Sequence, residues 1–289
     1  ASWSSLITGY ANQNLDERVL ACLEKMKSED IRWDAVIVAC CLKACANIQE
    51  IEKGFELHME LTKKGLESKP IINNALLGLY AKCGRILEAR CAIDQYPILD
   101  VVSWTALMTG YVDCGNALEA INCFEKLQLM GLTPDSVAYL CMLKACGSIG
   151  AIEKAKGVHV EVVKEGFESD TFIGNSLVDI YARFGFFIEA HEVLDELPSR
   201  DVVSWNSLMA GYVDHDLAEE VMECLEQMIL ECIVPNAISF VLILKACANL
   251  REISKGQEMH RVILEDGIEG DSFIGNTLVE FYAKCGYFI

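Results

Sequence analysis

Residues 101–111 read Val-Val-Ser-Trp-Thr-Ala-Leu-Met-Thr-Gly-Tyr, and this stretch decides the fold. Its large apolar side chains recur at the spacing of one helix face, and they are Trp104, Leu107, Met108 and Tyr111. This spacing predicts a helix over residues 102–112.

A second helix is expected directly after the first. The break between the two is Asp113-Cys114-Gly115-Asn116, and apolar residues at helical spacing resume over residues 117–130. Gly131 and Pro134 are stop signals for that helix. The unit is therefore a pair of short helices joined by a turn.

The pattern recurs every 101 residues. Leu-Lys-Ala-Cys occurs at residues 42–45, 143–146 and 244–247. The same offset relates four residue types, which are Trp3, Trp104 and Trp205; His58, His159 and His260; Asn74, Asn175 and Asn276; and Tyr80, Tyr181 and Tyr282. Each block divides into units of 35, 35 and 31 residues.

Two-helix units of this size cannot bury an apolar face alone, so they are expected to stack on one another. The sequence predicts an all-α fold, a right-handed superhelical α-solenoid of helix–turn–helix repeats that runs as a single solenoid over residues 1–289. It would have a continuous core and one concave groove. The recurring Trp, Tyr, Gly, Cys and Leu residues are interpreted mainly as packing positions.

Composition bounds the class of protein. Apolar residues make up 52% of the chain, enough for a sizeable core. No run of 18 uncharged apolar residues occurs, so no membrane partner is expected. The 14 cysteines include no Cys-x-x-Cys pair and are interpreted as small buried side chains in a reducing compartment. The net charge of −19 argues against a nucleic-acid partner.

The chain begins in mid-pattern at Ala1-Ser2-Trp3, without an initiator methionine, and ends as abruptly at Tyr287-Phe288-Ile289. We interpret it as a fragment of a longer protein, so a targeting peptide would lie outside this sequence.

Catalytic signatures are incomplete. His58-Met59-Glu60 and His159-Val160-Glu161 match the first half of a zinc deaminase signature, but no proline precedes a cysteine, so the second half is missing. The third copy, His260-Arg261-Val262, breaks the match. Phosphate loops and nucleophile constellations are also missing. We expect no metal, no cofactor and no enzymatic activity in this fragment.

Residues 101–111 together with Gly131-Leu132-Thr133-Pro134-Asp135 resemble a pentatricopeptide repeat motif, whereas the 34-residue tetratricopeptide repeat is the main competitor. The lengths 35, 35 and 31 resemble the P, L and S motifs of the plant-type PLS subfamily. The resemblance covers nine motifs: P-like 1–34, 101–135 and 202–236; L-like 35–69, 136–170 and 237–271; S-like 70–100 and 171–201, and a partial S-like 272–289.

The resemblance implies an RNA-binding role for certain positions of each motif. The apolar second residue of each motif would sandwich a base by packing on its faces. These residues are Ala1, Val36, Ile71, Val102, Val137, Phe172, Val203, Ile238 and Phe273. A buried helix start would carry the same residue types. The fifth and last residues of a motif would together read the base edge. These pairs are Ser4 with Asp34, Asn74 with Asp100, Thr105 with Asp135, Asn175 with Asp201, and Asn206 with Asn236, and Asn276 is the fifth residue of the partial last motif. A simple helix-capping role for the terminal Asp stays open.

The S-like motifs also carry a basic residue at a position that the family uses for phosphate, and these residues are Lys82, Arg183 and Lys284. The matching residue in two P-like motifs is Asp113 or Asp214, which departs from the family pattern. First helices carry further lysines, Lys43, Lys144 and Lys245, whereas the acidic excess is expected mainly on second helices.

The family's pairing pattern implies that Ser or Thr with Asp reads guanine, Asn with Asp reads uracil, and Asn with Asn prefers cytosine over uracil. The L-like pairs have apolar fifth residues and little expected specificity, and they are Ala39/Lys69, Leu140/Asp170 and Val241/Asp271. The expected partner is single-stranded organellar RNA of preferred sequence G-N-U-G-N-U-(C/U)-N-pyrimidine.

The resemblance further implies a sequence-specific RNA-binding factor of the mitochondrion or chloroplast that specifies sites of C-to-U RNA editing. The deaminase would come from a C-terminal DYW domain or a recruited partner. Splicing or transcript stabilisation are other RNA roles. Two alternatives stay open: a protein-binding helical scaffold, on which editing-factor proteins would dock at L motifs, and the remnant of a decayed gene.

Overall fold

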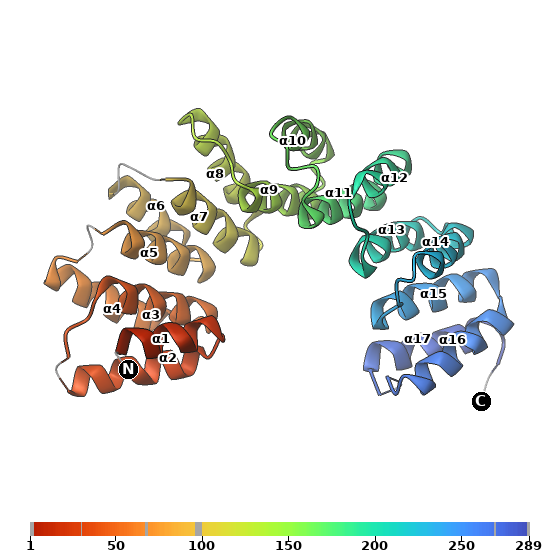
Figure 1. Ribbon diagram of the computed structural model, residues 1–289, viewed down its shortest axis with the longest axis horizontal. Helices are drawn as coiled ribbons and strands as arrows, with labels where there is room; N and C mark the ends of the chain where they lie inside the picture. The colour runs from red at the N-terminus through yellow and green to blue at the C-terminus, as the bar shows by residue number, and fades with distance from the viewer. Residues whose placement is uncertain (1–2, 30, 67–68, 96–99, 269, 288–289) are drawn as a thin grey trace. The chain divides into compact units, whose positions relative to one another are not determined.

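The computed structural model describes residues 3–29, 31–66, 69–95, 100–268 and 270–287. Every regular element in these ranges is an α-helix (Figure 1). The chain forms two compact units, residues 1–149 and 150–289. No described helix has the length and apolar character needed to cross a bilayer.

The first unit contains α1 (Trp3–Asn12), α2 (Asp16–Ser28), α3 (Ala35–Asn47), α4 (Ile51–Lys64), α5 (Pro70–Lys82), α6 (Ile86–Gln95), α7 (Val101–Asp113), α8 (Ala117–Leu129) and α9 (Ser136–Ile149). The second contains α10 (Ile152–Lys164), α11 (Thr171–Arg183), α12 (Phe187–Glu196), α13 (Val202–Asp214), α14 (Ala218–Leu230), α15 (Ala237–Leu250), α16 (Ile253–Glu265) and α17 (Ser272–Lys284). The helices α7 and α8 confirm the two predicted from the sequence, to within one residue at each end.

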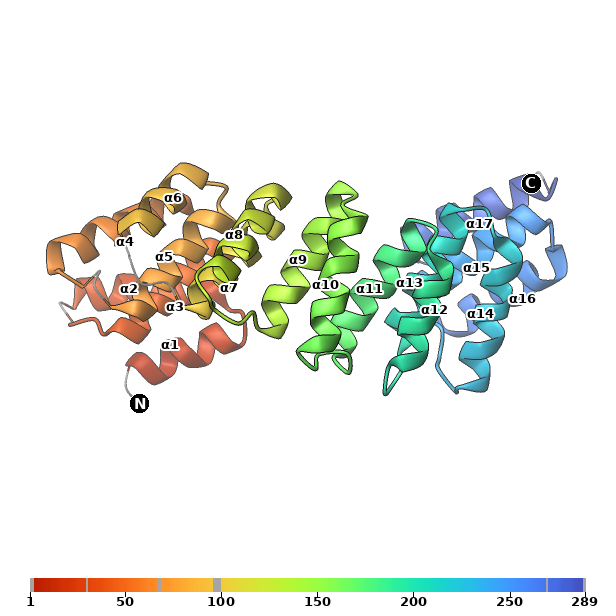
Figure 2. The same ribbon diagram turned by 90° about the horizontal axis from the view of Figure 1, so that it is seen from above.

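Consecutive first helices pack side by side within each unit. In the first unit, α3 contacts α1 and α5, and α7 contacts α5 and α9 (Figures 1 and 2). In the second unit, α13 contacts α11 and α15, and α15 contacts α17. The second helix of a pair packs on its own first helix, as α8 does on α7. Each unit is thus a helical solenoid, as the sequence predicts.

Four of the six recurring aromatic residues lie in the core, whereas Trp3 and Tyr282 in the first and last motifs are half-buried. Trp104, Trp205 and Tyr181 are each less than 5% exposed. Gly110 and Gly211 let neighbouring first helices approach closely, because a Cβ on either would lie 2.4 Å from the Cβ of Ala81 or Ala182. The interpretation of these repeated residues as packing positions is confirmed.

The repeated histidines join neighbouring motifs. The Nδ1 of His159 shares a hydrogen bond of 2.9 Å with the hydroxyl of Tyr181, and His260 does the same with Tyr282 at 2.9 Å. His58 pairs with Tyr80 in the first unit. The 101-residue recurrence of His and Tyr therefore reflects one contact, made between a second helix and the next first helix.

The fourteen cysteines are all free thiols. Seven are buried, which agrees with their interpretation as small core side chains, and these are Cys41, Cys45, Cys123, Cys141, Cys146, Cys224 and Cys247. That interpretation is wrong for Cys91 and Cys232, which are exposed.

Candidate nucleic-acid interface

Apolar side chains stand exposed at the start of the first helices. All eight described second-position residues are between 44% and 76% exposed, and they are Val36, Ile71, Val102, Val137, Phe172, Val203, Ile238 and Phe273. Ala1 lies outside the described residues. The next residue of the same helix is buried in contrast, as with Ser103 at 2% and Ser204 at 0%. A buried helix start therefore does not explain the apolar second positions.

The last residue of a motif caps the helix that follows. The Oδ1 atoms of Asp34, Asp100 and Asp135 accept the backbone N–H of the third residue of the next motif, each at 2.8 Å. Asp201 and Asn236 make the same cap for α13 and α15. The capping role left open by the sequence is real at these positions.

The same last residues also contact the fifth residue of their own motif. Ser4 donates to Asp34 at 2.6 Å and Thr105 to Asp135 at 3.3 Å. The Nδ2 groups of Asn175 and Asn206 donate to the Oδ1 atoms of Asp201 and Asn236, at 3.3 and 3.1 Å respectively. Stacking of the first helices thus brings together residues about thirty positions apart in the sequence.

Capping of the next helix uses only one of the two polar atoms at the tip of each terminal side chain. The Oδ1 of Asp201 accepts the N–H groups of Val203 and Ser204, while its Oδ2 has no hydrogen bond to a described residue. The Oδ2 of Asp135 and the Nδ2 of Asn236 are likewise left without one. Because Asp201 and Asn236 are exposed, these atoms are accessible to a ligand.

The fifth residues themselves are less accessible than their partners. Thr105, Asn175 and Asn206 are only 9%, 8% and 7% exposed. The sequence pattern does not predict this burial, which arises because the following first helix covers the side chain. A base edge would therefore meet the terminal carboxylate or amide first, with the fifth residue behind it.

The carboxylates of Asp100 and Asp201 are held in the ionised state, because both have lowered pKa values. The hydroxyl of Ser103 lowers the pKa of Asp100, and the backbone N–H of the same residue adds to this. For Asp201, burial raises the pKa, but the N–H and hydroxyl of Ser204 and the amide of Asn175 outweigh it, so the net shift is downward. Both groups are hydrogen-bond acceptors at neutral pH.

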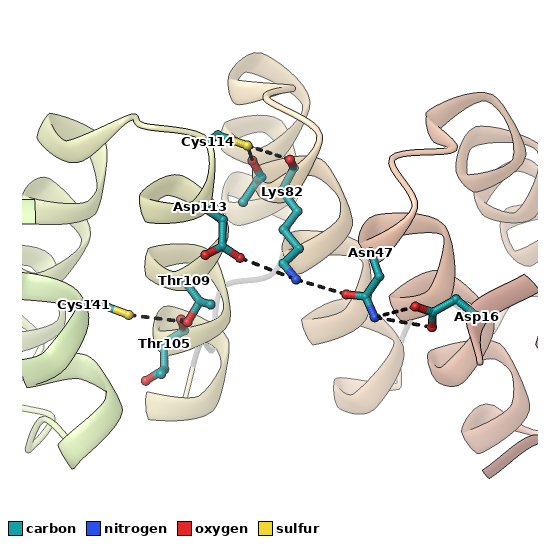
Figure 3. A network of polar contacts seen from close by, with 9 residues as sticks. Asp16, Asn47, Lys82, Thr105, Thr109, Asp113, Cys114 and Cys141 are labelled. Carbon is teal, nitrogen blue, oxygen red and sulfur yellow. Dashed lines mark hydrogen bonds and ion pairs between the residues drawn. The ribbon is translucent and has the colours of Figure 1, made fainter. Parts of the chain in front are cut away.

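The three basic residues assigned to phosphate are paired with acids. Lys82 lies between the Oδ1 of Asn47, at 3.0 Å, and the carboxylate of Asp113, at 3.5 Å (Figure 3). Arg183 pairs with Asp179 at 2.6 Å, and Lys284 with Glu280 at 2.9 Å. A phosphate would have to compete with these carboxylates.

A second set of lysines, already noted on the first helices, has no such partner. Lys43, Lys144 and Lys245 form no ion pair with a described residue. Lys43 lines a hollow of about 350 Å³ whose walls belong to α3, α5 and α7 and include Asn74 and Lys82. Two cations and Asn74, which the sequence predicts to read a base edge, therefore share one surface of the first unit.

Sequence reasoning missed the third residue of each motif. The hydroxyl of Ser103 donates to the Oδ1 of Asn74 at 2.6 Å, and Ser204 does so to Asn175 at 2.6 Å.

The L-like fifth residues Ala39, Leu140 and Val241 have no hydrogen-bonding side chain and are half-buried. Asn276 is exposed, and no terminal partner for it lies in this sequence.

Comparison with known proteins places these features in a family. Models of the PPR repeat family match residues 99–148 and 200–249, and models of the PPR repeat match residues 1–31, 137–167 and 175–202. Together they cover more than half of the chain.

Curated relatives from Arabidopsis thaliana match almost the whole chain. They are the pentatricopeptide repeat-containing proteins At2g39620, 31% identical over 99% of this chain and 34% of its own length; At4g18520, chloroplastic, 30% identical over 98% and 51%; and At2g03380, mitochondrial, 30% identical over 98% and 41%. The chain spans between about a third and a half of the length of these relatives.

The fold is similar to that of PPR10, a pentatricopeptide repeat protein solved in complex with an 18-nt psaJ RNA element. The TM-score is 0.79 at 20% identity, over 98% of this chain and 43% of PPR10. PPR10 from maize gives a TM-score of 0.55 at 19% identity, over 99% and 47%. The repeat matches, the relatives and the stacked helix pairs agree, and the chain belongs to the pentatricopeptide repeat family.

Proposed function

We propose that this chain binds single-stranded RNA and that each motif offers its exposed apolar second residue to the face of one base. The observation that carries this proposal is the row of eight exposed apolar side chains at the helix starts. Exposed apolar groups cost free energy in water, and a stacked base would cover them. PPR10, whose fold is similar, was solved with RNA.

Hydrogen-bond chemistry supports three classes of base readout. Thr105 with Asp135 offers acceptors, because the threonine hydrogen is already donated to the carbonyl of Val101 at 2.8 Å or to Asp135. Two acceptors complement the adjacent N1–H and N2–H donors of guanine. Ser4 with Asp34 is of the same class.

Asparagine changes the pattern offered to the base. Asn175 has a second Nδ2 hydrogen, and Asp201 has a free carboxylate oxygen, so the pair offers a donor beside an acceptor. This matches the O4 and N3–H of uracil. Asn206 with Asn236 offers donors from both amides, which matches the N3 and O2 acceptors of cytosine. The motifs would then read G-N-U-G-N-U-(C/U)-N-pyrimidine.

Charge limits the affinity. The net charge is −19, and the three S-motif cations are paired with carboxylates. Lys43, Lys144 and Lys245 are the better candidates for phosphate contact, because they are free of ion pairs with described residues. Few neutralised phosphates imply a shallow dependence of binding on salt.

We infer further that the chain is part of a plant-type PLS protein of a chloroplast or mitochondrion that specifies C-to-U editing sites. The motif lengths of 35, 35 and 31 residues and the organelle names of two relatives support this. In this proposal the described residues recognise RNA, editing-factor proteins dock on the L motifs, and a deaminase acts from elsewhere.

The test is a binding titration of the 289-residue chain with the nine-base RNA given above. A matched RNA with adenine at both guanine positions is the comparison, and each good contact should contribute about 1–3 kcal/mol of discrimination. Equal binding of the two RNAs would contradict the proposed readout. No binding to either would favour the protein scaffold instead.

A further inference from the structure

The third residue of each motif varies together with the fifth residue of the motif before it. Eight such junctions occur in the sequence. Where the fifth residue is Asn74, Asn175 or Asn206, the next motif has Ser103, Ser204 or Ser239. At the other five junctions the fifth residue is not asparagine, and the third residue is apolar: Ile37, Ile72, Ala138, Ile173 and Ile274.

The structure shows the contact behind this pattern. The hydroxyls of Ser103, Ser204 and Ser239 donate to the Oδ1 of the preceding asparagine at 2.6, 2.6 and 2.7 Å. Ser204 and Ser239 are 0% exposed, so these bonds are formed away from water. A buried amide oxygen without this donor would lack a partner, which is costly.

The contact with serine fixes the orientation of the asparagine amide. The Asn175 amide donates from Nδ2 to Asp201 at 3.3 Å and accepts at Oδ1 from Ser204 at 2.6 Å. A reversed amide would set its oxygen against the Asp201 carboxylate, with no proton between two acceptors. The Oγ of Ser204 lies 2.6 Å from the amide oxygen of Asn175 and 3.0 Å from the carboxylate of Asp201, so its single hydroxyl proton is shared by the two acceptors and lies mainly toward the amide.

We propose that a serine at the third position is a positioning residue for the preceding motif: it occupies the asparagine oxygen, so that only an N–H is left to meet the base. Serine thereby selects bases that present an acceptor at that point, uracil for the Asn–Asp pairs and cytosine for the Asn–Asn pair. Recognition of one base would require side chains of two consecutive motifs. This rests on the proposed RNA readout.

The junction of Thr105 and Ala138 offers a gain-of-function test in the full chain. There the fourth base is expected to be guanine. Thr105→Asn alone should select uracil only weakly, because Ala138 cannot hold the new amide. Thr105→Asn with Ala138→Ser should increase the preference for uracil over the other bases by roughly 2- to 12-fold relative to the single variant, the effect of one hydrogen bond.

Ala138→Ser alone is the matched control. Thr105 needs no donor from the next motif, so the fourth-base preference should stay with guanine. Ser204→Ala is the loss test: uracil selectivity at the sixth base should fall by a similar factor, while selectivity at the fourth base is unchanged. Affinities for the four RNAs that differ at one base are compared, and circular dichroism melting checks the fold of each variant.

The outcomes separate the two proposals. A merely structural serine would lower affinity for all four bases equally, and that result would overturn the positioning role. So would equal uracil selectivity in the single and double variants at Thr105. If the unmodified chain shows no base preference at the fourth and sixth positions, the proposed function fails and the positioning role fails with it.

Discussion

Truncation of Phe172 should separate RNA binding from folding. The side chain is 75% exposed at the start of α11, so about a quarter of it is removed from water by the protein. Complete burial of a phenylalanine contributes about 1.5–3 kcal/mol, so Phe172→Ala should cost less than about 1 kcal/mol of folding free energy. The higher helix propensity of alanine offsets part of this loss.

The expected loss of RNA binding is larger. Stacking of a base on an aromatic side chain contributes about 1–3 kcal/mol, which corresponds to roughly a 5- to 150-fold weaker Kd. Fluorescence anisotropy with labelled nine-base RNA would measure the Kd, and thermal denaturation would measure stability. The loss should be similar for every base at that position, because each base offers a face.

Ile188→Ala is the matched control. Ile188 is also 75% exposed, but it lies on a second helix, α12. Its truncation should change neither the melting temperature nor the Kd by much. If Phe172→Ala binds RNA as tightly as the unmodified chain, or if both variants weaken binding to the same extent, the exposed helix starts are not base clamps.

Further expectations concern charge, packing and pH. Asp113→Asn should free Lys82 from its 3.5 Å ion pair, so RNA binding should strengthen. The slope of log K against log salt concentration, measured by filter binding over a salt series, should steepen by up to about 0.7. Gly211→Ala should destabilise the fold by about 1–3 kcal/mol in thermal melts, because the new Cβ would lie 2.6 Å from a backbone carbon. Gly78→Ala, with nothing within 4 Å, should instead be neutral or stabilising by about 0.5–1 kcal/mol. Burial lowers the pKa of His159 below its usual 6.5. The unfolded chain therefore takes up the proton first as the pH falls, and the free energy of unfolding should decrease below about pH 6.5. A His159→Gln variant that kept the same pH dependence in urea melts would contradict this.

The helix pairs could be predicted from the sequence because their signals are local. Apolar spacing within a turn, the glycine after α8 and Pro134 depend only on neighbours in the chain. The 101-residue recurrence then required similar units to stack, since none buries its apolar face alone. Trp104 and Tyr181 are therefore in the core, as expected.

The candidate site was less accessible to sequence reasoning. An apolar residue at a helix start, such as Val102, fits a buried position as well as an exposed one, and only packing showed it to be 60% exposed. The same holds for Lys82, whose charge is visible in the sequence but whose ion pair with Asp113 is not.

The sequence by itself therefore determined the repeat, the helices and the residue types at each motif position. Tertiary structure alone decided which of those residues meet. Asp201 and Ser204 lie 26 and 29 positions after Asn175, and only the stacking of α13 on α11 brings their polar atoms within hydrogen-bonding distance of its amide. The reason is physical: helix formation depends on contacts within a few residues, whereas the orientation of a buried amide depends on whatever the next repeat places against it.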